Sequence, residues 1–255
     1  MYYDDIVSAS LVFLKCETFT SNSAQNDGTL ADLPRQAGVD ISVISSGQYN
    51  NGYSFVSNSG IAPTVGGLSV ADGSIGSGDN FSYGGWFHRN GKTAGTQFAI
   101  TLFQDLNYAH GSYISPYADS ECVVNYNNTT ISYGTGNGYP ADNDWHWYCV
   151  ERSGTALNLY IDNINTPVSG VVVGNLAGDI TSLNVGNFVW FSSNNFNPYF
   201  GLMDDVFVYP GVLTGEDKNN LKNATSAPAV VSSSASTQGK SSLKAAKKAA
   251  WNPNE

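Results

Sequence analysis

The chain has 255 residues, of which 27 are glycine and only 13% are charged, and its formal net charge at pH 7 is −10. Glycine and asparagine tolerate the positive φ angles of tight turns, so this composition favours many strands joined by turns and excludes a helical bundle. The acidic residues are concentrated before residue 224, whereas four of the eleven lysines and arginines follow it. An acidic body excludes a nucleic-acid surface, because phosphate backbones are bound by basic ones.

The first residues do not form a targeting signal, and no segment is long enough to span a membrane. Residues 1–5 are acidic where a secretory signal is basic, and the apolar run at residues 11–14 is shorter than the central segment of such a signal. No apolar run approaches the roughly 18 residues that a membrane span needs. We therefore expect a protein that folds in the cytosol and does not insert into a membrane.

The three cysteines, Cys16, Cys122 and Cys149, are widely spaced and form no C-x-x-C pair. An odd number of scattered cysteines disfavours both a disulfide framework and a zinc site. We expect all three to be buried free thiols.

Hydrophobic alternation predicts strands through most of the chain before residue 210. In residues 157–162, apolar side chains alternate with mostly polar ones, which is the period of a half-buried strand. In residues 145–150, Trp145, Trp147 and Cys149 should share one face and the residues between them the other. Many short strands separated by turn-forming residues predict an all-β sandwich or barrel. Further strands are expected at residues 54–56, 81–88, 98–103, 123–126, 183–190 and 203–209.

One short helix is expected after the last strand. Thr214 is a suitable N-cap, and Asp217 three residues later takes the place of the usual capping-box glutamate or glutamine. Leu213, just before the cap, should pack against an apolar residue of the next turn. The helix should end at about Lys222.

The last part of the chain differs in composition from the rest. Residues 224–240 are rich in serine and alanine, cannot bury a core and are expected to be a linker. In residues 241–255 the pattern is that of a short basic amphipathic helix and tail, with Lys244, Lys247 and Lys248 on one side. Trp251 projects toward the same side. These four residues are the candidates for anchoring the protein to a partner.

Four motifs, in chain order, resemble the laminin-G-like domains of the concanavalin A-like lectin and glucanase superfamily. They are F-S-Y-G-G-W-F at residues 81–87, D-W-H-W-Y-C-V at 144–150, L-N-L-Y-I-D at 157–162, and G-L-M-D-D-V-F-V-Y followed by V-L-T-G-E-D within 201–217. The resemblance implies that residues 1–223 form one antiparallel, jelly-roll-like sandwich of two sheets. It does not imply one activity, because this fold carries binding, catalytic and structural functions.

The same resemblance makes Asp204 and Asp205 candidate ligands of a structural calcium ion, which prefers carboxylate and carbonyl oxygens. The alternative is that Asp204 accepts hydrogen bonds from the backbone and Asp205 faces water. No other cofactor is expected.

Residues between Gln104 and Tyr139 match none of the family's motifs, and the loops of a sandwich often carry its function. Sugar binding needs aromatic rings with nearby amides or acids. This stretch is rich in tyrosine and asparagine, and the alternative is that several of its tyrosines belong to the core. The candidate ligand-binding residues are Tyr108, Tyr113, Tyr117, Tyr133 and Asn127.

No motif in the sequence predicts a catalytic centre. A glycosidase needs two carboxylates roughly 5–10 Å apart, which concanavalin-type glucanases supply on one strand as E-x-D-x-E. Asp119 and Glu121 are the nearest approach and lack the third acid. The three histidines are scattered, and His146, beside two tryptophans, is expected to have a structural role. We therefore expect a protein that is not an enzyme.

A virion surface protein, of the head-decoration or fibre type, accounts best for a lectin-like domain with no export signal. The resemblance extends to tailed-phage structural proteins, which carry such modules. The sandwich would bind a cell-surface glycan or adhere to the cell, and the C-terminal tail would bind other virion proteins. A homo-oligomer is the expected assembly. One alternative is a secreted bacterial carbohydrate-binding or adhesion module, and another, less favoured, is a glycan-cleaving enzyme.

Overall fold

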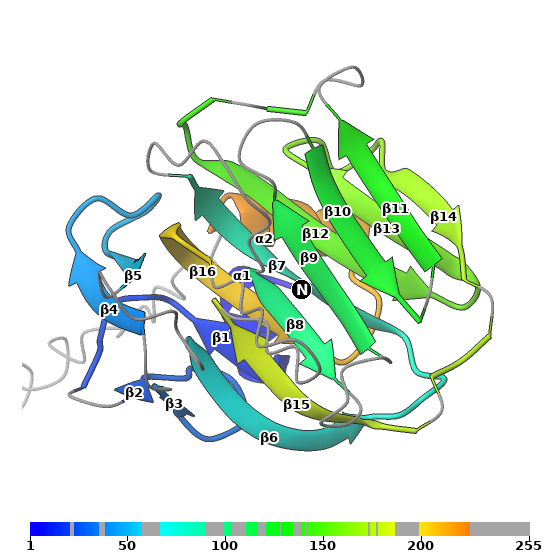
Figure 1. The fold of residues 1–255 in the computed structure, drawn as a ribbon, viewed down its shortest axis with the longest axis horizontal. Coiled ribbons are helices and arrows are strands. Elements are labelled where there is room, and N and C mark those ends of the chain that lie inside the picture. The colour runs from blue at the N-terminus through cyan, green and yellow to red at the C-terminus, as the bar shows by residue number, and fades with distance from the viewer. Residues whose placement is uncertain are drawn as a thin grey trace, which may run out of the picture.

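Two antiparallel β-sheets packed face to face form the body of the protein (Figure 1). The computed structural model describes residues 1–20, 23–35, 39–57, 67–89, 99–103, 111–116, 121–127, 129–134, 139–140, 142–172, 174–176, 178–186 and 199–224. Within these ranges the two large sheets hold eight and six strands, and two short helices are present. The sandwich and the helix after its last strand confirm the predicted all-β fold class.

The eight-stranded sheet contains the four sequence motifs. The order across it is β14–β13–β12–β7–β16–β5–β4, and β1 pairs with the part of β16 that β5 leaves free. β7 has the predicted bounds, residues 81–88. The members are β1 (Val12–Leu14), β4 (Val39–Ile44), β5 (Gly52–Ser57), β7 (Phe81–His88), β12 (His146–Ser153), β13 (Ala156–Ile161), β14 (Val168–Val171) and β16 (Gly201–Tyr209).

The six-stranded sheet lies against the inner face of the first, and a two-stranded sheet, β2 (Ser23–Ala24) with β3 (Leu33–Pro34), stands apart. The order across the six-stranded sheet is β11–β10–β9–β8–β15–β6. Its members are β6 (Leu68–Ile75), β8 (Ile100–Phe103), β9 (Gly111–Pro116), β10 (Glu121–Tyr126), β11 (Thr129–Gly134) and β15 (Ile180–Val185). β15 begins earlier than the predicted residue 183. A register irregularity between Ile180 and Ser182 breaks the alternation that the prediction relied on.

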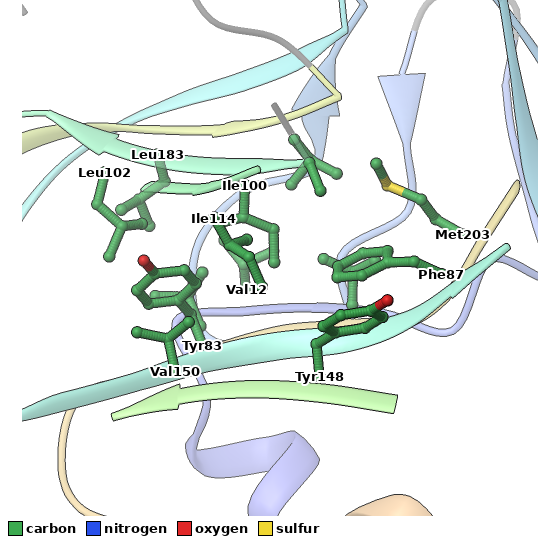
Figure 2. Close-up of a cluster of buried hydrophobic side chains, with 14 of the residues drawn as sticks. Val12, Tyr83, Phe87, Ile100, Leu102, Ile114, Tyr148, Val150, Leu183 and Met203 are labelled. Atoms are coloured by element: carbon green, nitrogen blue, oxygen red, sulfur yellow. The ribbon is translucent and has the colours of Figure 1, made fainter. Parts of the chain in front are cut away.

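The core fills the space between the inner faces of the two sheets. Figure 2 shows residues of the six-stranded sheet such as Leu102 and Ile114 opposite Tyr83 and Phe87 of β7. The hydroxyls of Tyr83 and Ser112 form a hydrogen bond of 2.8 Å across this space. Because side chains alternate along a strand, the residues between these core positions point to the two outer faces.

The outer face of the eight-stranded sheet is covered by helices α1 (Tyr3–Ala9) and α2 (Gly215–Lys222). As predicted, Trp147 and Cys149 share one face of their strand, and here they pack with Phe207 in a second buried cluster. Ile6 of α1 and Leu221 of α2 belong to the same cluster. The helices therefore shield an apolar face that water would otherwise reach.

Helix α2 begins and ends as predicted. Thr214 Oγ1 accepts from the backbone nitrogen of Asp217 at 3.1 Å, and Asp217 Oδ2 accepts from that of Thr214 at 3.0 Å, which completes the capping box. Lys218 Nζ donates to Glu151 Oε2 of β12 at 2.7 Å, and both side chains are only 5% exposed. The lysine ammonium also lies 4.2 Å from the centroid of the Tyr160 ring. A buried ion pair thus fixes α2 to the sheet.

The three thiols are all buried and free, as predicted. Among the residues that the structure describes, no helix has the length and apolar character needed to cross a bilayer. The predicted linker from residue 225 onward and the predicted tail lie outside the described residues, and so do the anchoring candidates Lys244, Lys247, Lys248 and Trp251.

Candidate functional site

A row of polar side chains crosses the outer face of the six-stranded sheet. Each lies between inward-facing residues of its own strand, as Asn125 lies between the core residues Val124 and Tyr126. The strand register places six of them side by side, and we call them the polar row: Thr130, Asn125, Tyr113, Thr101, Asn184 and Ser69.

The accessible part of the polar row lies toward its ends. Thr130 is exposed, Asn125, Tyr113 and Asn184 are half-buried, and Thr101 is buried. Asn125 Nδ2 donates to Thr130 Oγ1 at 2.9 Å. Amides and hydroxyls on rigid strands present donors and acceptors at fixed spacing, and the ring of Tyr113 lies among them. Such a surface suits a ligand that carries many hydroxyl groups.

The predicted ligand-binding residues do not form one cluster. Tyr113 belongs to the polar row, whereas Tyr133 lies on the opposite face of the sheet, packs against the core and lines a 110 Å³ cavity beside β13. Asn127 lies at the β10–β11 turn with a left-handed φ of 42°, and its Nδ2 donates to the Asn175 carbonyl at 2.8 Å. The other two candidates, Tyr108 and Tyr117, lie outside the described residues.

The two predicted calcium ligands lie at an irregularity in β16. The register between β16 and β7 shifts between Asp204 and Phe207, and Asp205 takes a left-handed φ of 45°. Gly85 of β7 lies opposite, where an added Cβ would be 2.9 Å from the Cα of Val206. Gly85, the second glycine of the F-S-Y-G-G-W-F motif, therefore allows this bulge to form.

Both carboxyl groups of the bulge are buried. Asp204 Oδ2 accepts from the backbone nitrogen of Tyr49 at 3.1 Å, and Asp204 Oδ1 accepts from that of Asp205 at 2.8 Å. The Tyr3 hydroxyl donates to Asp205 Oδ1 at 2.8 Å, and Asp205 Oδ2 is buried with no hydrogen-bond partner. Asp204 thus accepts backbone hydrogen bonds, as the alternative to calcium predicts. Asp205, however, does not face water, because the folded N-terminus covers it.

Burial raises the pKa of Asp204 to about 7 and that of Asp205 to about 8, and the charge of Asp204 contributes to the second value. The pair borders a pocket of about 280 Å³, which we call the acidic pocket. Perturbed carboxyl groups and left-handed backbone beside a pocket are marks of a functional site. The acidic pocket is lined by Tyr3, Asp4, Lys15, Glu17, Tyr49, Asn50, Asp204, Asp205 and Ala224.

The acidic pocket does not contain a ready-made metal centre. In the described part of the chain, no group of three or more His, Cys, Asp or Glu side chains is arranged to hold a metal ion. Calcium takes six to eight oxygen ligands, whereas three of the four carboxylate oxygens at the bulge already accept hydrogen bonds. Calcium at Asp204 and Asp205 therefore stays a prediction from the resemblance.

His146 connects two acidic residues at the end of β12. Its Nδ1 lies 2.6 Å from Asp162 Oδ2, and its Nε2 lies 2.6 Å from Asp142 Oδ1. Burial lowers the pKa of His146, but the two carboxylates outweigh it and raise the pKa above its ordinary value. A histidine held on both nitrogens fixes the loop before β12 to the turn after β13, which agrees with the structural role expected from the sequence.

Comparison with known proteins places this geometry in a family. Residues 63–217 match a laminin-G family model described as the concanavalin A-like lectin/glucanases superfamily. No curated protein sequence matches the chain. Domain 4 of AbnA, a GH43 extracellular arabinanase from Geobacillus stearothermophilus, in complex with arabinotriose, is similar with a TM-score of 0.51 and 16% identity, over 86% of this chain and 95% of that chain.

Two further solved structures share the fold. Trypanosoma rangeli sialidase in complex with sialic acid gives a TM-score of 0.60 at 12% identity, over 84% of this chain and 32% of that one. The binding domain of botulinum neurotoxin serotype D/C gives 0.50 at 13% identity, over 87% of this chain and 53% of that one. The chain spans about half the length of the neurotoxin chains that it matches. Since the family match covers more than half of the sequence, the protein belongs to the concanavalin A-like lectin/glucanase superfamily.

Proposed function

We propose that this protein is a non-enzymatic glycan-binding or adhesive domain on the surface of a virion, of the head-decoration or fibre type. The polar row on the six-stranded sheet is the observation that carries the glycan-binding part. In this proposal the C-terminal tail of the protein attaches the domain to other virion proteins.

The chemistry of the polar row supports a saccharide ligand. Asn125 and Asn184 each carry an amide, which forms hydrogen bonds to Thr130 and to Ser182, respectively. Thr130 adds a hydroxyl, and Tyr113 supplies an aromatic ring. Hydrogen bonds to such groups match the hydroxyls of a sugar, and a ring matches its apolar face. Saccharides also accompany two solved structures of similar fold, arabinotriose in the arabinanase domain and sialic acid in the sialidase.

The carboxyl groups at the bulge support binding rather than hydrolysis. A glycosidase needs an acid and a second carboxylate on either side of the scissile bond. Asp204 and Asp205 are neighbours in sequence, are at most 7% exposed, and already accept hydrogen bonds from the backbone of Tyr49 and the hydroxyl of Tyr3. With a single oxygen of the four unengaged, the pair does not provide the separate acid and second carboxylate that hydrolysis needs.

The charge distribution supports attachment through the tail. Four lysines follow residue 224 in a chain whose net charge is −10. A basic amphipathic segment at the end of a linker can bind an acidic surface of a partner without disturbing the sandwich. The tail lysines are therefore the proposed contacts with the particle.

The full-length protein should bind a defined glycan on a glycan array or on host envelope fragments. Asn125→Ala removes one of the two amides of the polar row and should weaken that binding at least 10-fold. Asn165→Ala, which changes an exposed amide in the β13–β14 turn, is the matched control and should leave binding unchanged. Absence of binding to any glycan, or equal affinities for both variants, would contradict the proposal and favour a purely architectural protein.

A further inference from the structure

The acidic pocket is built from five segments that are distant in sequence. They are α1, the residues after β1, the β4–β5 loop, the bulge of β16 and Ala224, two residues beyond the end of α2. Four acidic residues and one lysine line it. Lys15 offsets only part of this charge: it favours the ionised form of Asp205 but forms no ion pair with any residue in the described ranges, and its Nζ lies 5.9 Å from the centroid of the Tyr3 ring. The pocket therefore has a net negative lining.

An unpartnered acceptor in the wall indicates that this lining is incomplete. Asp205 is 7% exposed, and its Oδ2 has no hydrogen-bond partner. Leaving a buried polar atom unpaired is unfavourable, and native structures contain few such atoms. Strain is present beside it, since Cys16 and Asp205 both take left-handed φ angles, of 58° and 45°. Such strain is concentrated at ligand sites.

The remaining acceptors suit an ammonium group better than a metal ion. Only one of the four carboxylate oxygens at the bulge is unengaged, which is far from the six to eight oxygens of a calcium shell. An ammonium is a single positive charge with three donors, so one or two carboxylates satisfy it. Glu17 lies at the rim, where it accepts one hydrogen bond, from Asn51 Nδ2 at 2.9 Å.

The other lining residues suit a sugar ring that carries this ammonium. Tyr49 is 37% exposed, and its ring is held edge-to-face against Trp86 with centroids 6.0 Å apart. The side chain of Asn50 beside it is exposed. A fixed aromatic ring next to an amide can contact both the apolar face and the hydroxyls of a pyranose.

We infer that the acidic pocket binds an amino sugar with a free primary ammonium group, at a site separate from the polar row. Asp4 and Glu17 supply the negative charge that holds the ammonium, the unpartnered Oδ2 of Asp205 supplies an acceptor, and Tyr49 and Asn50 contact the ring. The choice of a sugar as the carrier rests on the proposed function, whereas the preference for a cation rests on the pocket alone.

Calorimetric titration of the full-length protein with glucosamine, N-acetylglucosamine and calcium chloride tests this inference. Glucosamine should bind saturably, and N-acetylglucosamine, which lacks the charge, should bind at least 10-fold more weakly. Calcium should not displace glucosamine. Equal binding of the two sugars, or calcium binding without glucosamine binding, would overturn the assignment.

Variants separate this site from the polar row. Glu17→Gln changes an exposed residue and should weaken glucosamine binding at least 10-fold without affecting the fold. Glu216→Gln, at an exposed position of α2, is the matched control and should bind as the parent does. Asn125→Ala should also leave glucosamine binding unchanged, so that failure of the polar row and failure of the acidic pocket give different results. Unchanged glucosamine binding by Glu17→Gln would refute the site.

Discussion

The polar row and the acidic pocket are built in opposite ways. The polar row is uncharged and stands on regular strands, so its spacing follows from strand register alone. The acidic pocket is charged, forms at a bulge and depends on α1 and on Ala224 beyond α2. Regular strands give a surface that resists perturbation, whereas a pocket assembled from distant segments fails when any one of them moves.

This difference separates the two sites in energy as well as in geometry. The polar row contains no titratable carboxyl group, and partial burial of its uncharged side chains has a small free-energy cost. The acidic pocket holds two carboxyl groups away from water beside the helices on the outer face of the eight-stranded sheet (Figure 1). Changes to those helices or to the charge of the pocket should therefore affect it selectively.

Lys218→Met should have the largest effect, because it leaves Glu151 buried without its partner. Loss of one member of a buried ion pair costs about 3–5 kcal/mol of unfolding free energy. Denaturant unfolding measures this loss, and glucosamine binding should weaken with it because α2 leads into the pocket. The double variant Lys218→Met/Glu151→Leu should recover most of the stability, and a single variant as stable as the parent would show that the pair does not hold α2.

Asp205→Asn should have the next largest effect, and its sign depends on pH. In the unfolded chain both carboxyl groups release their protons near pH 4, whereas in the folded protein they do so at about 7 and about 8. The folded state thus binds more protons between these values, and the unfolding free energy of the parent falls as the pH rises from 4 to 8. The raised pKa of His146 acts in the same direction.

The variant removes one of these groups while keeping an acceptor for Tyr3. Its unfolding free energy should fall less steeply across the same pH window and should exceed that of the parent by about 1–3 kcal/mol at pH 8. Denaturant unfolding at pH 5 and pH 8 measures both quantities. Asn125→Ala, in the uncharged polar row, should keep the pH profile of the parent. An Asp205→Asn profile as steep as that of the parent would contradict the raised pKa of Asp205 at the bulge.

The sequence was sufficient for most of the sandwich but not for all of its helices. Strands such as β7 and helix α2 were predictable because alternation and the Thr214 cap are local signals. Helix α1 has only seven residues, too few to be stable alone, and its position depends on distant contacts such as those of Met1 with Asp217 and Tyr3 with Asp205. Contacts between the two ends of a chain leave no local pattern to read.

The candidate sites show the same limit. Tyr113 and the neighbouring Asn125 follow from composition and alternation, but Tyr133 was grouped with them although it lies on the inner side of the sheet. The β10–β11 turn determines on which face of the sheet Tyr133 lies. The register that this turn gives to β11 could not be predicted from the sequence. Glu17 and Tyr49 were missed altogether, because only the folding of two distant segments onto the bulge brings them to Asp204 and Asp205.

Asn125→Ala should have a small effect on stability despite its effect on glycan binding. The side chain is half-buried, and the variant loses one hydrogen bond, to Thr130 Oγ1. Such a bond contributes about 0.5–1.5 kcal/mol. Denaturant unfolding of the variant should therefore show a loss in this range. A larger loss would mean that the polar row is a structural element of the sheet and not a surface kept for a ligand.

The smallest effect on folding is expected from the tail. Replacing Lys244, Lys247 and Lys248 together by glutamate should change the unfolding free energy by less than about 0.5 kcal/mol, because the linker separates these residues from the sandwich. Binding to glycan and to glucosamine should be unchanged as well. Incorporation of the protein into particles, measured by immunoblotting of purified virions, should be lost, because the variant presents acidic residues where the partner is expected to bind basic ones. Incorporation at the level of the parent would show that attachment depends on the sandwich itself, which would make the uncharged polar row the first surface to test for protein contacts.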